Sequence, residues 1–444
     1  MSLTKVTNSM ILGAVTNVLD YGAKGNGSTD DYLAIQAAID ATPTGGRIVF
    51  PPGIYMTSNQ LEINSKNSLT MIGYGGGNGP GIRWLGANDN SKAIIKIYRS
   101  SYCTIENLIL QALLTDKPGY GIRITTAGAG VAQGNLIKNC TINYPSISGI
   151  YIGNTDNLDQ SCDLNTIENC FIDFCGFSSV SIHGANTNET RITRGSYAVA
   201  ATCGIEIGTY ARGVFISDCL PYDTSSNITA LGWLSVSNKF TGIIEVANIV
   251  VELYYHPFLY AAPSEASFVA TGQIIIRNFI SSCNFAETGS AIDKIIEYYQ
   301  HGLLKLENCY ISGRSDAIAT YIKYETPDFS GPGLRTFDVS NVLLYPANMQ
   351  FAVPSTANSI GAETMWVGEY RTSIGSAITA GAVTNVRKNA GGSPVTSVSA
   401  IPATGTWPTG AVIFNSAPAT GSPAGWMCTV GGTPGTWKAM ANLA

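Results

Sequence analysis

The sequence predicts an all-β protein that folds as a parallel β-helix, with a helix over its N-terminal end and a small β module after it. Three observations predict this fold. A repeat returns every 24 to 33 residues through the middle of the chain, the composition favours short strands and tight turns, and a short helix lies near the start. Each of these features is considered in turn.

The repeat is centred on a polar residue between two short apolar stretches. One copy reads IENCFI, in which we expect Ile167 and Cys170 to face inward, Glu168 outward and Asn169 to form a bend. Asn and Asp tolerate the left-handed backbone of such a bend, and amides one repeat apart can form a hydrogen-bonded ladder. The residues at the bend in nine copies are Asn107, Asn139, Asn169, Arg194, Asp218, Asn248, Asn278, Asn308 and Asn341. At Arg194 we expect the following Gly195 to take over the bend.

A second strand is predicted ten residues after the bend, beginning near Gly149, Ser179 and Gly204 in three successive copies. Parallel strands that return once per repeat, about 4.8 Å apart, describe a β-solenoid. The cysteines that directly follow a bend should stack in its core as small apolar side chains. They are Cys140, Cys170, Cys219 and Cys309.

A short helix is predicted from about residue 31 and should cover the first coil, whose backbone groups would otherwise be unpaired. Ser28 and Asp31 fit a capping box. The expected apolar face of this helix consists of Leu33, Ile35, Ala37 and Ile39.

The composition argues against several classes of protein. Only 12% of the 444 residues are charged, and the net charge of −5 without a basic run predicts that nucleic acid is not a partner. The apolar runs are too short or carry carboxylates, so we expect no membrane insertion, and residues 1–13 lack the features of a signal peptide. Ten cysteines without a CxxC pair, with three histidines, predict buried free thiols, no metal and no cofactor.

Two stretches near the start, VLDYGAKGNGSTDDYLAIQAAID and GGRIVFPPGIYMTS, resemble the N-terminal signature of pectate-lyase-like right-handed β-helix proteins. The segment SLTKVTNSMI and the last 40 residues or so are similar to segments of bacteriophage tailspikes. This resemblance implies a right-handed β-helix in a homotrimeric virion spike, joined to the phage tail or an adaptor protein. It also implies that the spike binds and depolymerises a capsule or O-antigen polysaccharide at the surface of the host bacterium.

Four regions are expected along the chain. They are a lead-in segment at 1–16, the β-helix at 17–353, a linker or stem at 354–394 and the C-terminal β module at 395–444.

The expected working surface is the outer face of the second strand. Residues twelve after successive bends are Tyr151, Ser181 and Glu206, and Arg123 joins them if residues 113–118 loop out. Glu206 is the strongest catalytic candidate, because His183 and Asp173 fall on the adjacent repeat and on the turn that leads into it. Arg123, Tyr151, Ser181 and His183 are expected to bind the substrate.

Two chemistries are compatible with these residues. Hydrolysis of a glycoside needs an acid and a second carboxylate, which predicts Glu206 paired with Asp173 or with a carboxylate of the 156–163 loop such as Asp156. The stretch GNTDN around Asp156 is similar to an Asn-Thr-Asp motif of polygalacturonases, but the other motifs of that family do not follow. Elimination by a lyase would instead use Tyr151, His183 and Arg123 on a uronate polymer.

Two functions other than depolymerisation of a capsule are also compatible with the sequence. The chain can be a non-catalytic receptor-binding spike, or a secreted bacterial pectate lyase or polygalacturonase. A group of aromatic residues is expected in excursions between repeats, where they would stack on sugars or pack between subunits. The group comprises Trp233, Tyr254, Tyr255, His256, Tyr298 and Tyr299.

Overall fold

The computed structural model describes most of the chain up to residue 312 and shorter segments beyond it. The described residues are 15–75, 79–127, 130–153, 161–184, 186–223, 231–251, 257–263, 272–282, 295–300, 302–312, 320–324, 335–345, 350–352, 363–367, 370–372, 386–387, 396–398, 400–403, 407, 409–417 and 419–442.

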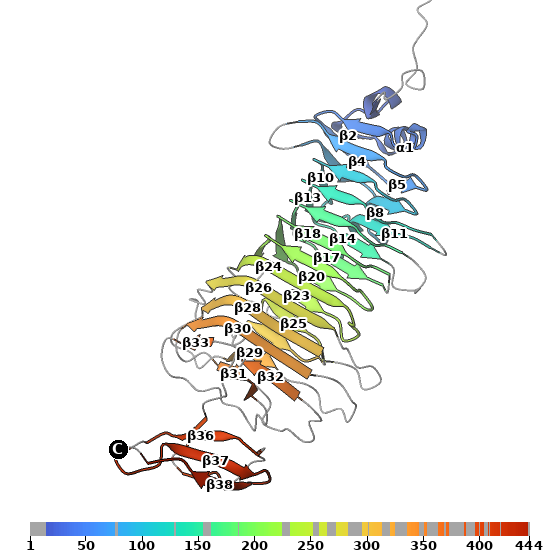
Figure 1. The fold of residues 1–444 in the computed structure, drawn as a ribbon. Coiled ribbons are helices and arrows are strands. Elements are labelled where there is room, and N and C mark those ends of the chain that lie inside the picture. The colour runs from blue at the N-terminus through green and yellow to red at the C-terminus, as the bar shows by residue number, and fades with distance from the viewer. Residues whose placement is uncertain are drawn as a thin grey trace, which may run out of the picture.

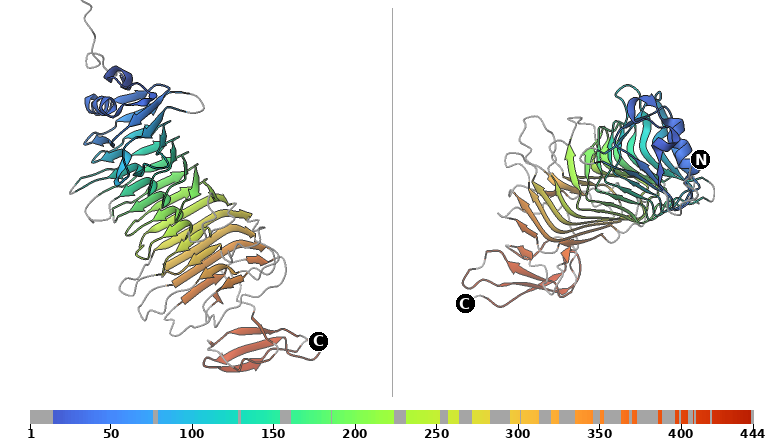
Figure 2. Two further views of the ribbon diagram at one scale, coloured as in Figure 1. Left: turned by 180° about the vertical axis from the view of Figure 1, so that it is seen from behind. Right: turned by 90° about the horizontal axis from the view of Figure 1, so that it is seen from above.

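Three parallel sheets wind around one core and form a β-solenoid (Figure 1). Each coil of the solenoid is called a rung below, and neighbouring rungs pair in parallel. The second sheet ends at β22, and from β24 on a single strand of the first sheet runs through the bend. Figure 2 shows the same stack from behind and from above, with helix α1 at the N-terminal end. The predicted parallel β-solenoid is therefore confirmed.

The first sheet contains the strands that precede the bends. Its members are β1 (Thr16–Asn17), β3 (Arg47–Phe50), β6 (Thr70–Gly73), β9 (Thr104–Glu106), β12 (Leu136–Lys138), β15 (Thr166–Glu168), β18 (Thr190–Thr193), β21 (Val214–Ser217), β24 (Ile243–Val251), β26 (Gln273–Ser282), β28 (Gly302–Ser312), β30 (Arg335–Tyr345), β32 (Glu363–Val367), β33 (Tyr370–Thr372) and β34 (Val386–Arg387).

The second sheet follows the bends. Its members are β2 (Asn26–Asp30), β4 (Ile54–Thr57), β7 (Gly81–Trp84), β10 (Ile109–Gln111), β13 (Thr141–Asn143), β16 (Phe171–Asp173), β19 (Ser196–Val199) and β22 (Leu220–Asp223).

The third sheet carries the predicted second strands. Its members are β5 (Leu61–Asn64), β8 (Asp89–Tyr98), β11 (Pro118–Thr125), β14 (Ser148–Gly153), β17 (Ser178–His183), β20 (Cys203–Ile207), β23 (Gly232–Val236), β25 (Leu259–Ala261), β27 (Ile296–Tyr298), β29 (Thr320–Tyr324) and β31 (Gln350–Ala352).

Stacked aliphatic side chains fill the core. In the first sheet the aligned residues Ile105, Ile137, Ile167, Ile192 and Ile216 are at most 1% exposed. Burying one such side chain stabilises the fold by about 1.5–3 kcal/mol. Because the same position recurs in every rung, this contribution accumulates along the solenoid.

The bends adopt the left-handed backbone that the repeat predicts. The described bend residues from Asn107 to Asn308 have φ between 47° and 56°. Their amides form a ladder: Asn169 donates to Asn139 at 2.8 Å, and Asn278 donates to Asn248 at 2.9 Å. The expectation for Gly195 was wrong, because Arg194 itself takes the bend with φ 47° and its guanidinium pairs with Glu168 at 2.8 Å.

The cysteines after the bends are buried, as predicted. The nine cysteines of the described residues are free and buried, and burial raises the pKa of Cys219 to about 12. Their thiols donate to backbone carbonyls of the same rung and of the preceding rung, as Cys140 does to Lys138 and Ile105. They therefore act as small core side chains.

Helix α1 (Tyr32–Ala41) covers the first rung, next to the short 3-10 helix η2 (Val18–Tyr21). The predicted capping box is wrong, because Ser28 lies in β2 and the Asp31 carboxylate accepts from the amides of Lys24 and Gly25 at 2.7 and 3.0 Å. Asp31 therefore holds the preceding glycine turn in place.

The apolar face of α1 also differs from the prediction. Ile35, Ala38 and Ile39 are buried, whereas Leu33 is 78% exposed and Ala37 is exposed. Residues three and four apart share a face of a helix, so the buried stripe begins at Ile35.

Two of the predicted sugar-stacking aromatics belong to the core. Trp233 is fully buried, donates its indole N–H to the Tyr197 carbonyl at 2.8 Å and stacks on Phe258. Tyr298 is also fully buried. Tyr254, Tyr255 and His256 lie outside the described residues.

The C-terminal region contains two kinds of strand. Strands β32, β33 and β34 fall within residues 354–394, the expected linker or stem, and extend the first sheet in parallel register. A separate sheet contains β35 (Thr396–Val398), β36 (Val412–Asn415), β37 (Gly425–Val430) and β38 (Thr436–Ala439). The last three strands of this sheet are antiparallel, and Trp426 is buried in it.

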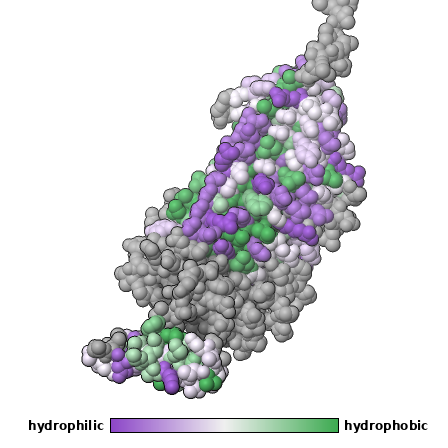
Figure 3. All heavy atoms as spheres, in the orientation of Figure 1, coloured by the Kyte–Doolittle hydropathy of each residue, from purple (hydrophilic) through white to green (hydrophobic). Residues whose placement is uncertain are grey.

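The outer surface of the solenoid is mixed in character. Hydrophilic and hydrophobic side chains are interspersed over the rungs that face the viewer in Figure 3. Within the part of the chain that the structure describes, no helix has the length and apolar character required to span a membrane.

The ladder makes a testable prediction at Asn248, which donates to Asp218 and accepts from Asn278. Asn248→Ala should destabilise the protein by about 1–3 kcal/mol, because alanine is strained at φ 56° and both bonds are lost. Asn248→Gly loses the same bonds without the strain and should cost less. Urea unfolding followed by circular dichroism measures both variants, and an equal loss would contradict the role assigned to the left-handed backbone.

Candidate functional site

A column of outward side chains crosses the third sheet. Arg123, Tyr151, Ser181 and Glu206 are aligned on the neighbouring strands β11, β14, β17 and β20. The predicted alignment is therefore confirmed, including the looping out of residues before Arg123. Two members of the column are not exposed as expected, because Tyr151 is 6% and Ser181 2% exposed. Since rungs are about 4.8 Å apart, the column presents one side chain per rung along the solenoid axis.

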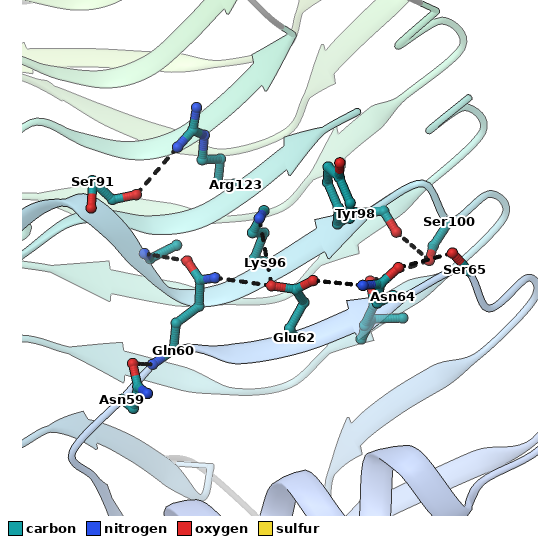
Figure 4. Close-up of polar contacts among 12 residues, drawn as sticks. Asn59, Gln60, Glu62, Asn64, Ser65, Ser91, Lys96, Tyr98, Ser100 and Arg123 are labelled. Atoms are coloured by element: carbon teal, nitrogen blue, oxygen red, sulfur yellow. Dashed lines mark hydrogen bonds and ion pairs between the residues drawn. The ribbon is translucent and has the colours of Figure 1, made fainter. Parts of the chain in front are cut away.

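The column continues toward the N-terminal end with charged residues (Figure 4). Lys96 lies next to Arg123 and pairs with Glu62 at 3.5 Å, while the Gln60 amide also donates to Glu62. Arg123 donates to the Ser91 carbonyl at 3.2 Å. Two cations therefore lie on consecutive rungs, and one of them has a carboxylate partner.

Glu206 is held by two donors that converge on one of its oxygens. His183 Nε2 lies 3.0 Å and Ser181 Oγ 2.8 Å from Oε2. Ser181 is in turn bonded to Ser178 and Ser148, at 2.7 and 3.0 Å. The other oxygen, Oε1, accepts no bond from any described residue and is not buried. This arrangement fixes the carboxylate and leaves one oxygen accessible.

The surroundings of Glu206 favour its ionised form. Burial alone would raise its pKa, but the hydrogen bond and charge of His183 and the bond from Ser181 bring the pKa below its ordinary value of 4.5. The side chain keeps 21% of its surface exposed. At neutral pH Glu206 is therefore an accessible anion that can act as a base or a nucleophile, and it is unsuited to donate a proton.

Tyr151 has the opposite character. Burial, with the nearby Tyr120 hydroxyl, raises its pKa, and Arg123 opposes this only in part. Its ring stacks on His183 with centroids 5.4 Å apart, and the Arg123 guanidinium lies 5.5 Å from its centroid. Tyr151 is only 6% exposed, and its hydroxyl makes no hydrogen bond to a described residue. Tyr151 therefore stays protonated and can donate a proton.

Two glycines make room for His183. A Cβ on Gly208 would lie 1.9 Å from His183 Nδ1, and a Cβ on Gly153 would lie 1.7 Å from the His183 carbonyl oxygen. Nδ1 is buried without a partner, so Nε2 is the nitrogen that makes the polar contact of this ring. The imidazole thus serves to orient Glu206.

The structure does not bring Asp173 to this column. Asp173 lies on β16 in the second sheet, whereas Glu206 lies on β20 in the third. The charge of Asp173 acts instead on Tyr222 and Cys175, whose pKa values it raises in addition to burial. Asp156 lies outside the described residues.

Sequence reasoning missed three residues that support the site. Tyr120, Ser148 and Ser178 occupy the same position in consecutive rungs, three residues before Arg123, Tyr151 and Ser181. A polar or aromatic residue recurring at that position was the available signal. Among the described residues, no three metal-binding side chains cluster.

Comparison with known proteins agrees with this geometry. Residues 15–233 match a family model described as Rhamnogalacturonase A/epimerase, pectate lyase-like. Residues 15–233 therefore belong to the pectate lyase-like right-handed β-helix superfamily. The match covers the solenoid from its first strand to the site column.

Similarity to characterised proteins is local. The chain is 39% identical over 77 residues to an exo-poly-alpha-D-galacturonosidase of Dickeya chrysanthemi, which is 16% of this chain and 13% of that protein. It is 44% identical over 68 residues to alginate lyase 7 of Azotobacter vinelandii, which is 14% of this chain and 8% of the relative.

A solved structure supports the fold. The catalytic unit of a GH87 alpha-1,3-glucanase from Streptomyces thermodiastaticus has a TM-score of 0.52 and 13% identity, covering 77% of this chain and 66% of the enzyme. Such low identity shows a shared fold alone.

The electrostatics of Glu206 make a testable prediction. His183→Ala and Ser181→Ala should each raise the pKa of Glu206, because the burial remains while a donor is lost. In the wild type, the lowered pKa stabilises the fold at neutral pH, and this stabilisation is lost as the pH falls through the folded-state pKa. The variants should lose stability at higher pH than the wild type, seen in melting temperatures from about pH 3 to 7.

Ser235→Ala is the matched control for this experiment. Ser235 is aligned with Glu206 on the next rung but makes no hydrogen bond to it. An equal shift in this control would contradict the assignment of the donors.

Proposed function

We propose that this chain is a phage tailspike that binds and depolymerises a bacterial surface polysaccharide, either a capsule or an O-antigen. The observation that carries the proposal of cleavage is the ionised Glu206, held by His183 and Ser181 with one oxygen open. Arg123 and Tyr151 lie on the same rigid sheet face in register with it. A polymer lying along the column would meet the partly exposed Arg123 and Glu206, with the buried Tyr151 and Ser181 between them.

The described residues supply the groups needed for elimination more fully than those needed for hydrolysis. Hydrolysis needs a second carboxyl group near Glu206 as proton donor or base. Asp173 lies in another sheet, and the described loop acid Asp163 is already bonded to Ser161 and Asn188, so the predicted hydrolysis depends on Asp156 or another acid. Elimination needs a base and a proton donor, and the column contains both in Glu206 and Tyr151. Elimination is therefore the reaction that the described geometry supports best.

The elimination can be written with the groups of the column. Glu206 Oε1 removes the C5 proton of a uronate, and the electrons of that bond form the C4=C5 double bond. The C4–O bond breaks, and the protonated Tyr151 donates its hydroxyl proton to the leaving oxygen. Arg123 lies three rungs from Glu206, so it would pair with the carboxylate of another uronate along the polymer and hold the chain in register.

The substrate class and the place in a virion rest on resemblance. Both termini are similar to tailspike segments, and the named relatives act on polygalacturonate and alginate, which are acidic polymers. The chain spans only a small part of those relatives. A non-cleaving receptor-binding spike is the rival proposal, and a secreted pectate lyase or polygalacturonase is a third.

Cleavage and its chemistry are tested together on purified capsules from a panel of bacteria. Glu206→Gln should lower the cleavage rate about 10²–10⁴-fold and retain binding, because it removes the base without changing its size. Elimination should yield fragments lighter by one water than hydrolytic products, with new ultraviolet absorbance, detected by mass spectrometry and spectrophotometry. Saturated reducing ends would select hydrolysis, and intact polymer on every strain that binds would select the rival spike.

Tyr151→Phe tests the proton donor, with Tyr120→Phe as its matched control. Tyr120 packs on Tyr151 with centroids 5.1 Å apart, one strand away. Only Tyr151→Phe should lower the cleavage rate. Equal losses in both variants would point to packing of the rings.

Assembly as a homotrimer is part of the proposal and has its own support. On the C-terminal side of Thr141, four apolar side chains that lie two residues after a bend are 43–50% exposed, namely Phe171, Leu220, Val250 and Ile280, with Ser196 between the first two. Another copy of this chain would bury these side chains.

Light scattering should give three times the chain mass of 46.8 kDa, and Val250→Asp with Ile280→Asp should lower the measured mass. Leu33→Asp, at an exposed apolar position on α1, should leave it unchanged, and a monomeric wild type would overturn the assembly.

A further inference from the structure

A hollow opens in the second sheet where a glycine interrupts a row of outward side chains. Ile54, Gly81 and Ile109 are aligned on β4, β7 and β10, and Thr141 follows on β13. The other three residues carry branched side chains, so Gly81 leaves a gap between two isoleucines. The pocket there has a volume of about 350 Å³, within the size range of small-ligand sites.

The fold does not require glycine at position 81. A Cβ at Gly81 would meet only the Ile109 carbonyl oxygen, at 3.9 Å, and no left-handed φ is present. The neighbouring Gly79 and Gly53 differ, because a Cβ there would lie 2.7 and 2.6 Å from backbone oxygens. The hollow at Gly81 is therefore open space that a strand residue with a side chain could fill without strain.

One edge of the hollow is cationic. Arg83 Nε donates to Gln111 Oε1 at 3.2 Å, which fixes the guanidinium plane. Its two terminal nitrogens have no partner among the described residues, and no described carboxylate pairs with it. Gln111 and Asn143 continue this polar row on the next rungs, and Asn143 Oδ1 is buried without a partner.

We propose that this hollow binds one carboxylate-bearing sugar residue of a polysaccharide. The apolar face of a pyranose ring would lie over Gly81 between Ile54 and Ile109, whose strands are two rungs or about 9.6 Å apart. Its carboxylate would pair with the terminal nitrogens of Arg83, and its hydroxyls would meet Gln111. The combination of apolar walls with one fixed cation selects an anionic sugar over a neutral one.

This site is separate from the Glu206 column, because it lies on a different sheet, between β4 and β10 (Figure 1). It makes no use of the proposed cleavage chemistry. A polymer held here would stay close to the third sheet between cleavage events, which raises its effective concentration at the column.

The experiment measures binding of a galacturonate trimer to the full chain carrying Glu206→Gln, by calorimetry and by soaking crystals. Gly81→Thr fills the hollow with a residue that favours strands and should leave the melting temperature unchanged or higher. It should remove one binding event per chain. Arg83→Met should weaken that event about tenfold or more, through loss of a charge-assisted bond.

Two controls and a neutral probe complete the test. Arg47→Met removes an exposed arginine from β3 of the first sheet and should leave binding unchanged. Maltotriose, which has no carboxylate, should bind the hollow more weakly than the galacturonate trimer. In a chain with native Glu206, Gly81→Thr should leave the cleavage rate at saturating polymer unchanged, so this proposal and the proposed function fail separately.

Three outcomes would overturn the proposal. The first is that Gly81→Thr, added to the Glu206→Gln chain, leaves binding of the galacturonate trimer unchanged. The second is that maltotriose binds as tightly as the acidic trimer. The third is that the soaked crystals show no sugar density over Gly81.

Discussion

The left-handed bend that recurs from Asn107 to Asn308 is the constraint on which the regular part of the solenoid depends. One residue with φ near 50° turns the chain in each of these rungs, so their later strands start from the same geometry. Asn and Asp accept this backbone at low cost and pair with the rung below. Arg194 shows that the conformation matters more than the side chain, since arginine adopts it and replaces the amide ladder with an ion pair.

Because the rungs are regular, residues at a fixed spacing in the sequence lie side by side on one face of a sheet. Because the strands of the third sheet begin at a nearly constant distance from the bend, side chains from β11, β14, β17 and β20 align in one column. The backbone pairing, rather than contacts between the side chains, sets their spacing. A site built in this way is rigid, and it suits a substrate that is itself a repeating chain. Loops between rungs can vary in length without moving the column.

Within the column, burial and hydrogen-bond partners give Glu206 and Tyr151 different protonation states. Glu206 and Tyr151 are both largely buried, yet donors lower the pKa of the first and burial raises that of the second. His183 contacts both, through a hydrogen bond to Glu206 and a ring stack with Tyr151. It lies between an anion and a proton donor that are two rungs apart, so the two groups keep distinct protonation states. Gly208 and Gly153 make this possible, since a side chain at Gly208 would displace the imidazole and one at Gly153 would clash with the His183 backbone carbonyl.

Sequence alone determined the repeat, the bends, the inward cysteines and the order of the column, because each follows from periodicity in a chain whose rungs pair in parallel. It failed where a residue has two possible partners. Asp31 is a residue type that commonly caps helices, but its carboxylate accepts hydrogen bonds from the amides of the preceding turn. Asp173 is close to Glu206 in sequence spacing but lies on another sheet, and Trp233 and Tyr298 face the core. Only the tertiary structure decided which oxygen of Glu206 stays open, and that Gly81 leaves a hollow beside Arg83. These features arise from residues on different rungs and turns, whose distances and burial depend on how the coils stack.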